Sequence, residues 1–513
     1  MNEQILITVE AALRRAGVLR PEATLLIALS GGADSVALLR TVSALGKRYG
    51  FSTRAAHVEH GLRGEASAED ARFCERLCAE MGVPFTLDRA NLSGGMAAPG
   101  AEARAREVRY RLLLGRAREC GADALLLAHH LDDQAETVLS HLVRGSGTRG
   151  LGGMREASRV NGVLLVRPLL KLSKADLLAS LNGAPYRVDD SNAEPCCQRN
   201  RLRTGVMPLL RAENPRVVEH ISQSAALLSM DDDCLQTQAD VLLAHALIDE
   251  PPFLCVRKAR LLAAPDAVAV RALRKFVQRG MAYLVAETSP AVTERVPAAE
   301  PAADCSCFSL LEERSLSTGD SLALLTLLHA PDGGSLNLPH GLCMQATARY
   351  LHLTRMEDGS PVAKTAVPPP VSLEGGIELV RLGGFSFRLS AFDPVKESAP
   401  DGINAVVLPN AVLSQTVLRT KDTDDHIHPF GAGGGKPLRR YLIDHKLDLA
   451  FRAHMPLLCR GNEVLWAVGV GASEGTRITD APSTRITVEG DLPWTRETPR
   501  EAAHHADQNK MKE

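Results

Sequence analysis

The chain has 513 residues, of which 45% are hydrophobic and only 4% aromatic, and its formal net charge at pH 7 is −2. A chain of this length exceeds a single hydrophobic core, so we expect several domains. The near-zero charge excludes a uniformly basic nucleic-acid-binding protein, so any such surface must be a local basic patch. No apolar run reaches the roughly 18 residues of a membrane helix, and no signal peptide is evident. These features predict a cytoplasmic protein without membrane contact.

Residues 24 to 170 alternate short apolar runs with segments of helical period. The runs that predict strands are ATLLIAL (23–29), FSTRAAHVEH (51–60), VPFTL (83–87) and ADALLLAHH (122–130). Strands that alternate with helices indicate right-handed crossovers between parallel strands. We therefore predict an α/β domain, a parallel twisted sheet with helices on both faces. A helical middle domain and a small mixed α/β C-terminal domain are expected to follow.

Composition divides the chain into five expected parts. Residues 1–216 carry the α/β pattern, and residues 217–330 place Leu, Ala and Val at helical spacing. Residues 331–405 are expected to form a divergent Pro/Gly-rich connecting region, and residues 406–490 a compact C-terminal module. The tail, residues 491–513, has almost no apolar side chains and is expected to be disordered.

A Gly-rich turn, SGGADS, separates the first predicted strand from the first long helix of this domain. The residues of the turn are Ser30, Gly31, Gly32, Ala33, Asp34 and Ser35. Glycines let backbone N–H groups approach a ligand, and a helix N-terminus favours an anion, so the turn suits a phosphate. By itself the turn favours the simpler interpretation, an ordinary strand-to-helix turn with Ser30 or Asp34 as N-cap. It matches neither the Walker A pattern nor G-x-G-x-x-G.

Three acids open the helix that follows the strand ADALLLAHH. Asp132, Asp133 and Glu136 share one face of this helix, directly after His129 and His130. Acids at this position also complement the helix dipole, which is the purely structural interpretation. The two histidines beside them, at the carboxyl end of a strand, favour a functional site.

SGGADS resembles the PP-loop of the N-type ATP pyrophosphatases, which have an adenine nucleotide alpha hydrolase-like fold. Five further stretches of the chain are HVEHGLR (57–63), AHHLDDQAETVLSHLVRGSGTRGLGGM (128–154), RPLLKLSKADL (167–177), residues 189–215 with QRNRLR, and residues 436–479 from KPLRRYL. Together and in this order, they resemble the tRNA(Ile)-lysidine synthase family. Glu59 departs from the family pattern, which more often has Asp or Asn there.

The resemblance implies an enzyme that uses ATP and Mg²⁺ to adenylate the wobble cytidine of a tRNA(Ile) with a CAU anticodon. Free L-lysine then displaces AMP. It implies that the turn Ser30–Ser35 binds the ATP pyrophosphate and that Asp34 helps to hold Mg²⁺. Asp133, His130 and Arg109 complete the implied catalytic set, with Arg109 near the ATP phosphate or the adenylate.

Lysine carries two ammonium groups at neutral pH, so an acidic pocket would select it. The resemblance assigns this pocket to Asp132, Asp133 and Glu136. The ε-amine, with a reference pKa of about 10.4, must lose a proton before it attacks C2 of cytosine. The candidates for the base that accepts this proton are His129, His130, Asp132 and Asp133.

Two basic stretches are predicted to contact tRNA phosphates. One is QRNRLR, and the other spans residues 436–460, where six basic residues stand against two acidic ones. The expected contacts are Arg199, Arg201, Arg203, Lys436, Arg439, Arg440 and Arg452. A homodimer is left open.

Three other functions are alternatives to this one. A PP-loop tRNA thiolase, or another tRNA base-modifying enzyme that adenylates its substrate, shares the first step. Thiolases usually need catalytic cysteines, and none of the eleven cysteines of this chain forms a C-x-x-C pair. A tRNA-binding protein with a degenerate loop is disfavoured by the intact SGGADS. A small-molecule amidating synthetase is disfavoured by the basic C-terminal module.

Overall fold

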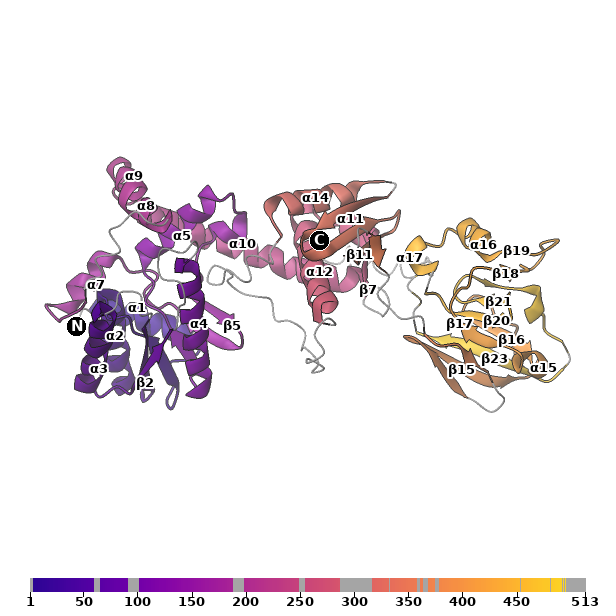
Figure 1. Ribbon diagram of the computed structural model, residues 1–513, viewed down its shortest axis with the longest axis horizontal. Helices are drawn as coiled ribbons and strands as arrows, with labels where there is room; N and C mark the ends of the chain where they lie inside the picture. Colours follow the sequence, from indigo (N-terminus) through magenta and orange to yellow (C-terminus); the bar gives the residue numbers. More distant parts are fainter. Residues whose placement is uncertain are drawn as a thin grey trace. The chain divides into compact units, whose positions relative to one another are not determined.

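The computed structural model describes residues 3–59, 65–90, 101–187, 198–248, 254–286, 316–331, 333–357, 360–362, 368–373, 378–452, 454–479, 481–490, 492 and 494. The chain divides into two compact units. Figure 1 labels their helices and strands. The first comprises Met1–Thr237 and Thr293–Thr318, and the second Gln238–Val292 and Gly319–Glu513. Of the predicted motifs, residues 60–63, 188–197 and nearly all of the tail lie outside the described residues.

The first unit is built on a six-stranded sheet with the order β3-β2-β1-β4-β6-β5. Its strands are β1 (Thr24–Ala28), β2 (Ser52–Glu59), β3 (Phe85–Arg89), β4 (Ala124–Leu126), β5 (Ala157–Val160) and β6 (Val163–Val166). All neighbours pair in parallel except β5, which is antiparallel to β6. The α/β prediction is therefore confirmed, with one antiparallel edge strand added to the predicted sheet. Asn161 and Gly162 form the hairpin turn with positive φ angles of 49° and 80°.

Helices cover both faces of this sheet. Leu25 and Ile27 of β1 pack in one core with α1, α2, α3 and α7, whereas Leu26 packs on the other face with α4. This division follows from the two-residue period of a strand. The helices are α1 (Glu3–Arg15), α2 (Ala33–Tyr49), α3 (Glu65–Met81), α4 (Ala101–Glu119), α5 (Leu131–Val143), α6 (Thr148–Leu151) and α7 (Lys174–Leu181).

The order of the strands reverses between β1 and β4. The chain leaves β1 toward β2 and β3 and then returns to β4 on the other side of β1. At such a switch point the segments that follow the two strands meet at the carboxyl edge of the sheet, where α/β proteins bind ligands. The segment after β1 is SGGADS, and the segment after β4 leads into the acidic start of α5.

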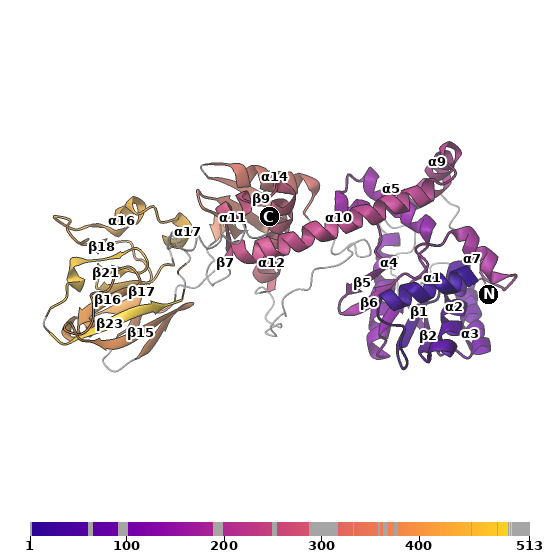
Figure 2. The same cartoon turned by 180° about the vertical axis from the view of Figure 1, so that it is seen from behind.

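The end of the first unit is helical. It contains α8 (Gln198–Arg201), a π-helical turn (Leu202–Val206), α9 (Met207–Glu213) and the start of α10 (Val217–Ala246). Met207 and Val218 pack with Leu131 and Ala135 in a small core, which fixes this segment against α5. Figure 2 shows α10 as one uninterrupted helix.

The second unit contains an antiparallel sheet with the order β7-β8-β11-β10-β9, and β12 pairs with β11. An added methyl group at Gly280 of α12 would lie 2.0 Å from Leu353 Cδ2, so α12 lies directly on β11. The strands lie partly within the segment expected to connect domains, residues 331–405. The elements are β7 (Leu247–Ile248), β8 (Cys255–Arg257), α11 (Lys258–Leu262), α12 (Asp266–Ala286), α14 (Thr318–His329), β9 (Gly334–Leu338), β10 (Leu342–Ala346), β11 (Tyr350–Glu357) and β12 (Ser360–Val362).

The rest of the second unit contains two more sheets around one core that includes Phe387, Phe451 and Trp466. Their orders are β13-β17-β20-β21-β18-β19, with β22 beside β21, and β14-β15-β23-β16. The elements are β13 (Val371–Ser372), β14 (Leu379–Leu382), β15 (Phe385–Phe392), β16 (Ala405–Pro409), α15 (Asn410–Leu413), β17 (Val417–Arg419), β18 (His426–Ile427), β19 (Lys436–Pro437), α16 (Leu438–Asp444), α17 (Leu449–Arg452), β20 (Leu457–Arg460), β21 (Glu463–Ala467), β22 (Gly471–Ala472) and β23 (Ser483–Glu489). No helix in the described part of the chain is long and apolar enough to cross a bilayer.

Candidate active site

The loop SGGADS forms a closed turn between β1 and α2. Gly31 adopts a φ of +85°, a left-handed conformation that favours glycine. The Ser35 hydroxyl accepts a hydrogen bond from the Ser30 backbone N–H at 3.2 Å and donates one to the Gly32 carbonyl at 2.9 Å. Gly32 caps α2 without a side-chain hydrogen bond. A helix start of this kind presents backbone N–H groups and partial positive charge to an anion.

The loop is held from behind by α3 and by the segment that follows α7. An added methyl group at Gly31 would lie 3.2 Å from Cys74 Sγ and 3.4 Å from Phe73, so the loop packs tightly against α3. The Gly31 carbonyl accepts a hydrogen bond from the Arg187 backbone N–H at 2.9 Å. The Arg187 side chain is in turn bound to Asp70 at 2.7 Å. These contacts fix the conformation of the loop before any ligand binds.

Asp34, the predicted Mg²⁺ ligand, is paired with a lysine to which the sequence pattern assigned no role. Lys174 Nζ donates to both carboxylate oxygens of Asp34 at 2.7 Å. Lys174 belongs to the stretch RPLLKLSKADL, so the motif pointed to this segment without distinguishing the residue. It is the first residue of α7, and its backbone N–H donates to Asp132 Oδ2 at 3.0 Å. Lys174 therefore links the PP-loop to the acidic helix start.

The acids predicted to bind lysine are paired with two of the arginines predicted to bind tRNA. Arg199 donates to Glu136 Oε2 and to Asp133 Oδ1, both at 2.8 Å. Arg203 donates to Glu136 Oε1 at 2.6 Å and to Glu136 Oε2 at 2.8 Å. The Glu136 side chain is only 4% exposed. Burial disfavours the charged form of Asp133, but Arg199 and the two neighbouring histidines outweigh this effect and lower its pKa to about 2.

Asp132 lies at the same helix start but has different partners. Besides the Lys174 backbone, it accepts a hydrogen bond from the Arg211 guanidinium. Burial opposes its ionisation, but His130 and the Lys174 N–H hold the pKa of this carboxyl well below its usual range. All three predicted lysine-binding acids therefore have cationic partners in this structure.

His130 stands between the PP-loop and the acids. Its Nε2 is 3.7 Å from Asp34 Oδ2 and 3.5 Å from Asp133 Oδ2, and its Nδ1 is 3.5 Å from Asp132 Oδ2. Burial favours the neutral ring, yet the three carboxylates outweigh burial and raise the pKa of His130. Three of the predicted catalytic residues, Asp34, His130 and Asp133, are thus brought together.

The adjacent histidine has the opposite electrostatic character. Burial, and then the nearby Arg167 cation, lower the pKa of His129 well below its ordinary value. Arg167 is itself fully buried and donates to the Arg155 carbonyl at 2.8 Å. His129 is therefore a neutral ring near pH 7, next to a histidine whose pKa is shifted in the opposite direction.

Arg109, the fourth predicted catalytic residue, lies on α4 beside a buried tyrosine. Its guanidinium carbon is 5.9 Å from the centroid of the Tyr110 ring, and that of Arg106 is 5.4 Å from the same ring. Tyr110 is also among the groups that act on the half-buried Arg199. A contact between Arg109 and a phosphate stays a prediction.

The remaining predicted tRNA contacts differ in how they are held. Arg201 is exposed on α8, and Arg439 is exposed on α16. Lys436 and Arg440 both pair with Asp444, at 3.4 and 3.3 Å. Arg452 Nε donates to the Leu447 carbonyl at 2.9 Å, which stabilises the turn before α17. Arg439 and Arg440 are the most openly presented cations of this set in the C-terminal module.

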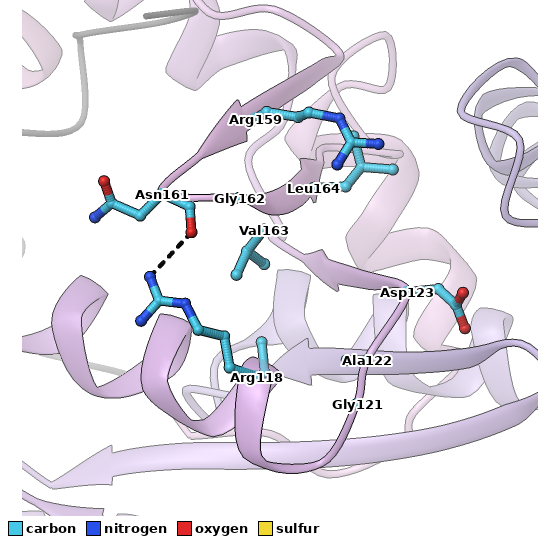
Figure 3. Close-up of a pocket in the computed structure, with 10 residues that line it drawn as sticks. Arg118, Gly121, Ala122, Asp123, Arg159, Asn161, Gly162, Val163 and Leu164 are labelled. Carbon is cyan, nitrogen blue, oxygen red and sulfur yellow. Dashed lines mark hydrogen bonds between the residues drawn. The ribbon is translucent and has the colours of Figure 1, made fainter. Parts of the chain in front are cut away.

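A pocket of about 410 Å³ lies where β4 and β6 begin, at the edge of the first sheet opposite the PP-loop (Figure 3). It is lined by the turn before β4 and by the β5–β6 hairpin, where Arg118 donates to the Asn161 carbonyl at 3.0 Å. None of the predicted site residues lines it. The chemistry is therefore expected at the carboxyl edge, where the PP-loop and the acids meet.

Known protein families match both end regions of the chain, and known proteins match nearly its whole length. The PP-loop domain family matches residues 1–210, and the TilS substrate C-terminal domain family matches residues 416–488. The tRNA(Ile)-lysidine synthase of Symbiobacterium thermophilum is 30% identical over 471 residues, which cover 89% of this chain and 91% of that protein. The chain belongs to the tRNA(Ile)-lysidine synthase family.

Two further relatives of the family match over similar lengths. The enzyme of Geobacter sulfurreducens is 30% identical over 480 residues, or 90% of this chain and 92% of that protein. That of Dehalococcoides mccartyi is 27% identical over 496 residues, or 93% of this chain and 97% of that protein. The predicted family is confirmed, and the chain is an ATP-dependent PP-loop ligase of tRNA modification.

Proposed function

We propose that this chain, in the cytoplasm, joins lysine to the wobble cytidine of the CAU-anticodon tRNA(Ile) and releases AMP and diphosphate. One observation carries the assignment of its site. His130 Nε2 lies within 3.7 Å of Asp34 from the PP-loop and within 3.5 Å of Asp133 from the acidic helix start. A nucleotide site and an amine site thus share one edge of the sheet, as a ligase that transfers an activated group to an amine requires.

The PP-loop is the proposed site of the ATP phosphates. The fixed turn and the start of α2 supply backbone donors, and Ser30 and Ser35 add hydroxyl groups. Mg²⁺ fits Asp34, because this ion is usually bound by one or two carboxylates together with substrate phosphates. No group of three or more His, Cys, Asp or Glu residues in the described chain could hold a metal alone. The ion would supply charge neutralisation at the phosphates.

The first step activates the cytosine. The C2 carbonyl oxygen attacks the α-phosphorus of ATP, and the bond between that phosphorus and the bridging oxygen breaks. The electron pair leaves with diphosphate, and AMP becomes a good leaving group on C2. We propose Arg109 as a contact of the α-phosphate, consistent with its cationic side chain on α4.

The second step needs a bound lysine. We propose that Asp133 and Glu136 bind its ammonium groups after Arg199 and Arg203 leave them. Both arginines are also suited to tRNA phosphates, so an incoming anticodon stem offers them an alternative partner. The acids would then become available only when tRNA is present.

His130 is the proposed base for the lysine ε-amine. It lies between the nucleotide and the acids, so it reaches both the adenylate and the amine. Asp132 and Asp133 have lowered pKa values and His129 is held as a neutral ring of low basicity, so all three accept a proton less readily. His130 is the only one of these four candidates whose pKa is raised. Loss of the proton gives a free amine that attacks C2, and AMP departs with the electron pair.

The thiolase alternative finds no support among the described cysteines near the nucleotide site. Cys74 lies directly behind Gly31, but burial raises its pKa to about 12. Burial likewise raises the pKa of Cys78 to about 11. A sulfur-transfer enzyme needs a reactive thiolate, and these two thiols are held neutral.

A single assay tests the proposal. Purified protein is incubated with ATP, Mg²⁺, labelled lysine and a CAU-anticodon tRNA(Ile) transcript, with a transcript that carries U at the wobble position as control. We expect base-stable label in the CAU transcript alone, with one AMP released per lysine. Base stability separates this product from an aminoacyl ester. AMP release without lysine incorporation would assign the adenylation to a different nucleophile.

A further inference from the structure

We propose that Lys174 is a diphosphate-binding residue, which pairs with Asp34 in the nucleotide-free enzyme and transfers to the β- and γ-phosphates when ATP occupies the PP-loop. The inference rests on the proposed placement of ATP and its cation at this loop. It adds a residue from α7 to a site otherwise built from the segments after β1 and β4.

The backbone of Lys174 is anchored at the site. The Leu131 N–H donates to the Leu172 carbonyl at 2.9 Å, and the Lys174 N–H donates to Asp132 Oδ2 at 3.0 Å. Ser173 caps α7 through the Asp176 N–H at 3.1 Å. These bonds hold the start of α7 against the start of α5, so only the side chain of Lys174 has freedom to move.

The side chain of Lys174 can change partners without a rearrangement of the core. It is 42% exposed, and the Asp34 side chain is 24% exposed, so the pair lies at the open edge of the sheet. The Lys174 ammonium uses both carboxylate oxygens of Asp34, at 2.7 Å each. A divalent cation on Asp34 needs at least one of these oxygens and repels the ammonium. Binding of the cation therefore releases Lys174.

The released ammonium has a new partner at hand. ATP brings several negative charges to the loop at the moment Asp34 is taken, and charged hydrogen bonds to phosphate are strong. During adenylation the bond from the α-phosphorus to the bridging oxygen breaks, and the leaving diphosphate gains charge. A cation at that position stabilises the leaving group, while Lys174 itself stays protonated throughout. We therefore expect Lys174 to affect the adenylation step and not the later attack by lysine.

The test measures binding of inorganic diphosphate with Mg²⁺ to the full chain by calorimetry, so it does not depend on turnover. Lys174→Gln should weaken diphosphate affinity by roughly 10-fold or more, the value of one charged hydrogen bond. Lys174→Arg keeps the charge and should stay within about 3-fold of the unmodified protein. Lys171→Gln is the matched control, because Lys171 lies on the same segment but pairs with Glu156 at 3.7 Å. Its affinity should not change.

The outcomes separate this inference from the proposed function. Unchanged diphosphate affinity in a folded Lys174→Gln protein overturns the role of Lys174 and leaves the PP-loop assignment intact. Failure of the unmodified protein to bind diphosphate overturns both. If Lys174→Gln does not fold, Asp34→Asn is compared with the double variant Asp34→Asn, Lys174→Gln, which leaves no unpaired carboxylate. Because Asp34 is the proposed Mg²⁺ ligand, this comparison uses diphosphate without Mg²⁺, at a concentration at which the unmodified protein still binds it. A further loss of affinity in the double variant supports the proposal, and equal affinity overturns it.

Discussion

Arg203 Nε donates to Glu136 Oε1 at 2.6 Å across 67 residues of sequence, and the Glu136 side chain is 4% exposed. A buried carboxylate that already pairs with two arginines binds a substrate ammonium only weakly, because the two guanidinium groups repel the ammonium. In the proposed lysine pocket, binding of lysine would therefore depend on where Arg199 and Arg203 go. This dependence would give a physical reason for lysine to bind after tRNA.

Replacement of Glu136 tests the proposed lysine pocket directly. Glu136→Gln keeps the shape of the side chain but removes its charge, so the KM for lysine should rise roughly 10- to 100-fold. The rate of tRNA adenylation, measured as transfer of labelled AMP to the cytidine in the absence of lysine, should stay within about 3-fold of that of the unmodified protein. Glu213→Gln, an exposed acid on α9, is the control and should leave the lysine KM unchanged. An unaltered lysine KM in Glu136→Gln would exclude this carboxylate from the pocket.

Removal of one arginine tests the exchange of partners. In Arg203→Ala, Glu136 loses one of its two cations, so we expect lysine to bind the tRNA-free enzyme about 5-fold more tightly or better, within the usual range of coupling between sites. Arg201→Ala removes an exposed cation from the neighbouring α8 and should leave lysine affinity unchanged while tRNA affinity falls. Weaker lysine binding in Arg203→Ala would mean that Arg203 stays beside Glu136 and supports the pocket when lysine binds.

The two neighbouring histidines have pKa values shifted in opposite directions, so they predict opposite effects of pH on stability. The effect of His129 falls in the pH range that is easier to measure. Its folded pKa lies well below the ordinary value of about 6.5. Below pH 6.5 the unfolded chain therefore binds a proton that the folded chain does not, and the free energy of unfolding falls as pH decreases. One such group contributes a slope of at most about 1.4 kcal/mol per pH unit. His129→Gln should flatten the fall in thermal unfolding midpoint between pH 6.5 and 5, whereas His445→Gln, on the other unit, should not. An identical pH profile in His129→Gln would contradict a neutral ring at this position.

Local patterns in the sequence were sufficient to locate the two helix starts that meet at the candidate site. SGGADS between an apolar run and a helix, and the acids of α5 after His130, were both visible from spacing, whereas their ligands came from the family resemblance and stay predictions. The Asn161-Gly162 dipeptide favours a type I′ hairpin turn and so marks the antiparallel edge strand, which the alternation of strands and helices alone does not predict. The strands β9 and β10 have five residues each, and Pro339–Gly341 separates them, so each strand is too short to show a clear alternation.

Pairings between distant residues could not be predicted in the same way. Lys174 meets Asp34 over 140 residues, and Arg199 meets Glu136 over 63. No local pattern specifies which of several cations reaches a given carboxylate, because this depends on how α7 and α8 pack around the sheet. The sequence therefore indicated the candidate residues of the site but not their partners.

The C-terminal module offers a test of tRNA binding that keeps its fold intact. Deletion after residue 430 would remove Phe451 and Trp466 from the core, so reduced binding would not identify a contact surface. Arg439→Ala and Arg440→Ala instead change exposed side chains of α16. Each should weaken tRNA binding regardless of sequence and reduce the slope of log affinity against log salt by about 1 for each phosphate that is no longer neutralised. Arg388→Ala is the control, because Arg388 lies in β15 and pairs with Glu489. If both α16 variants retain the slope of the unmodified protein, the tRNA backbone contacts a different face of the module.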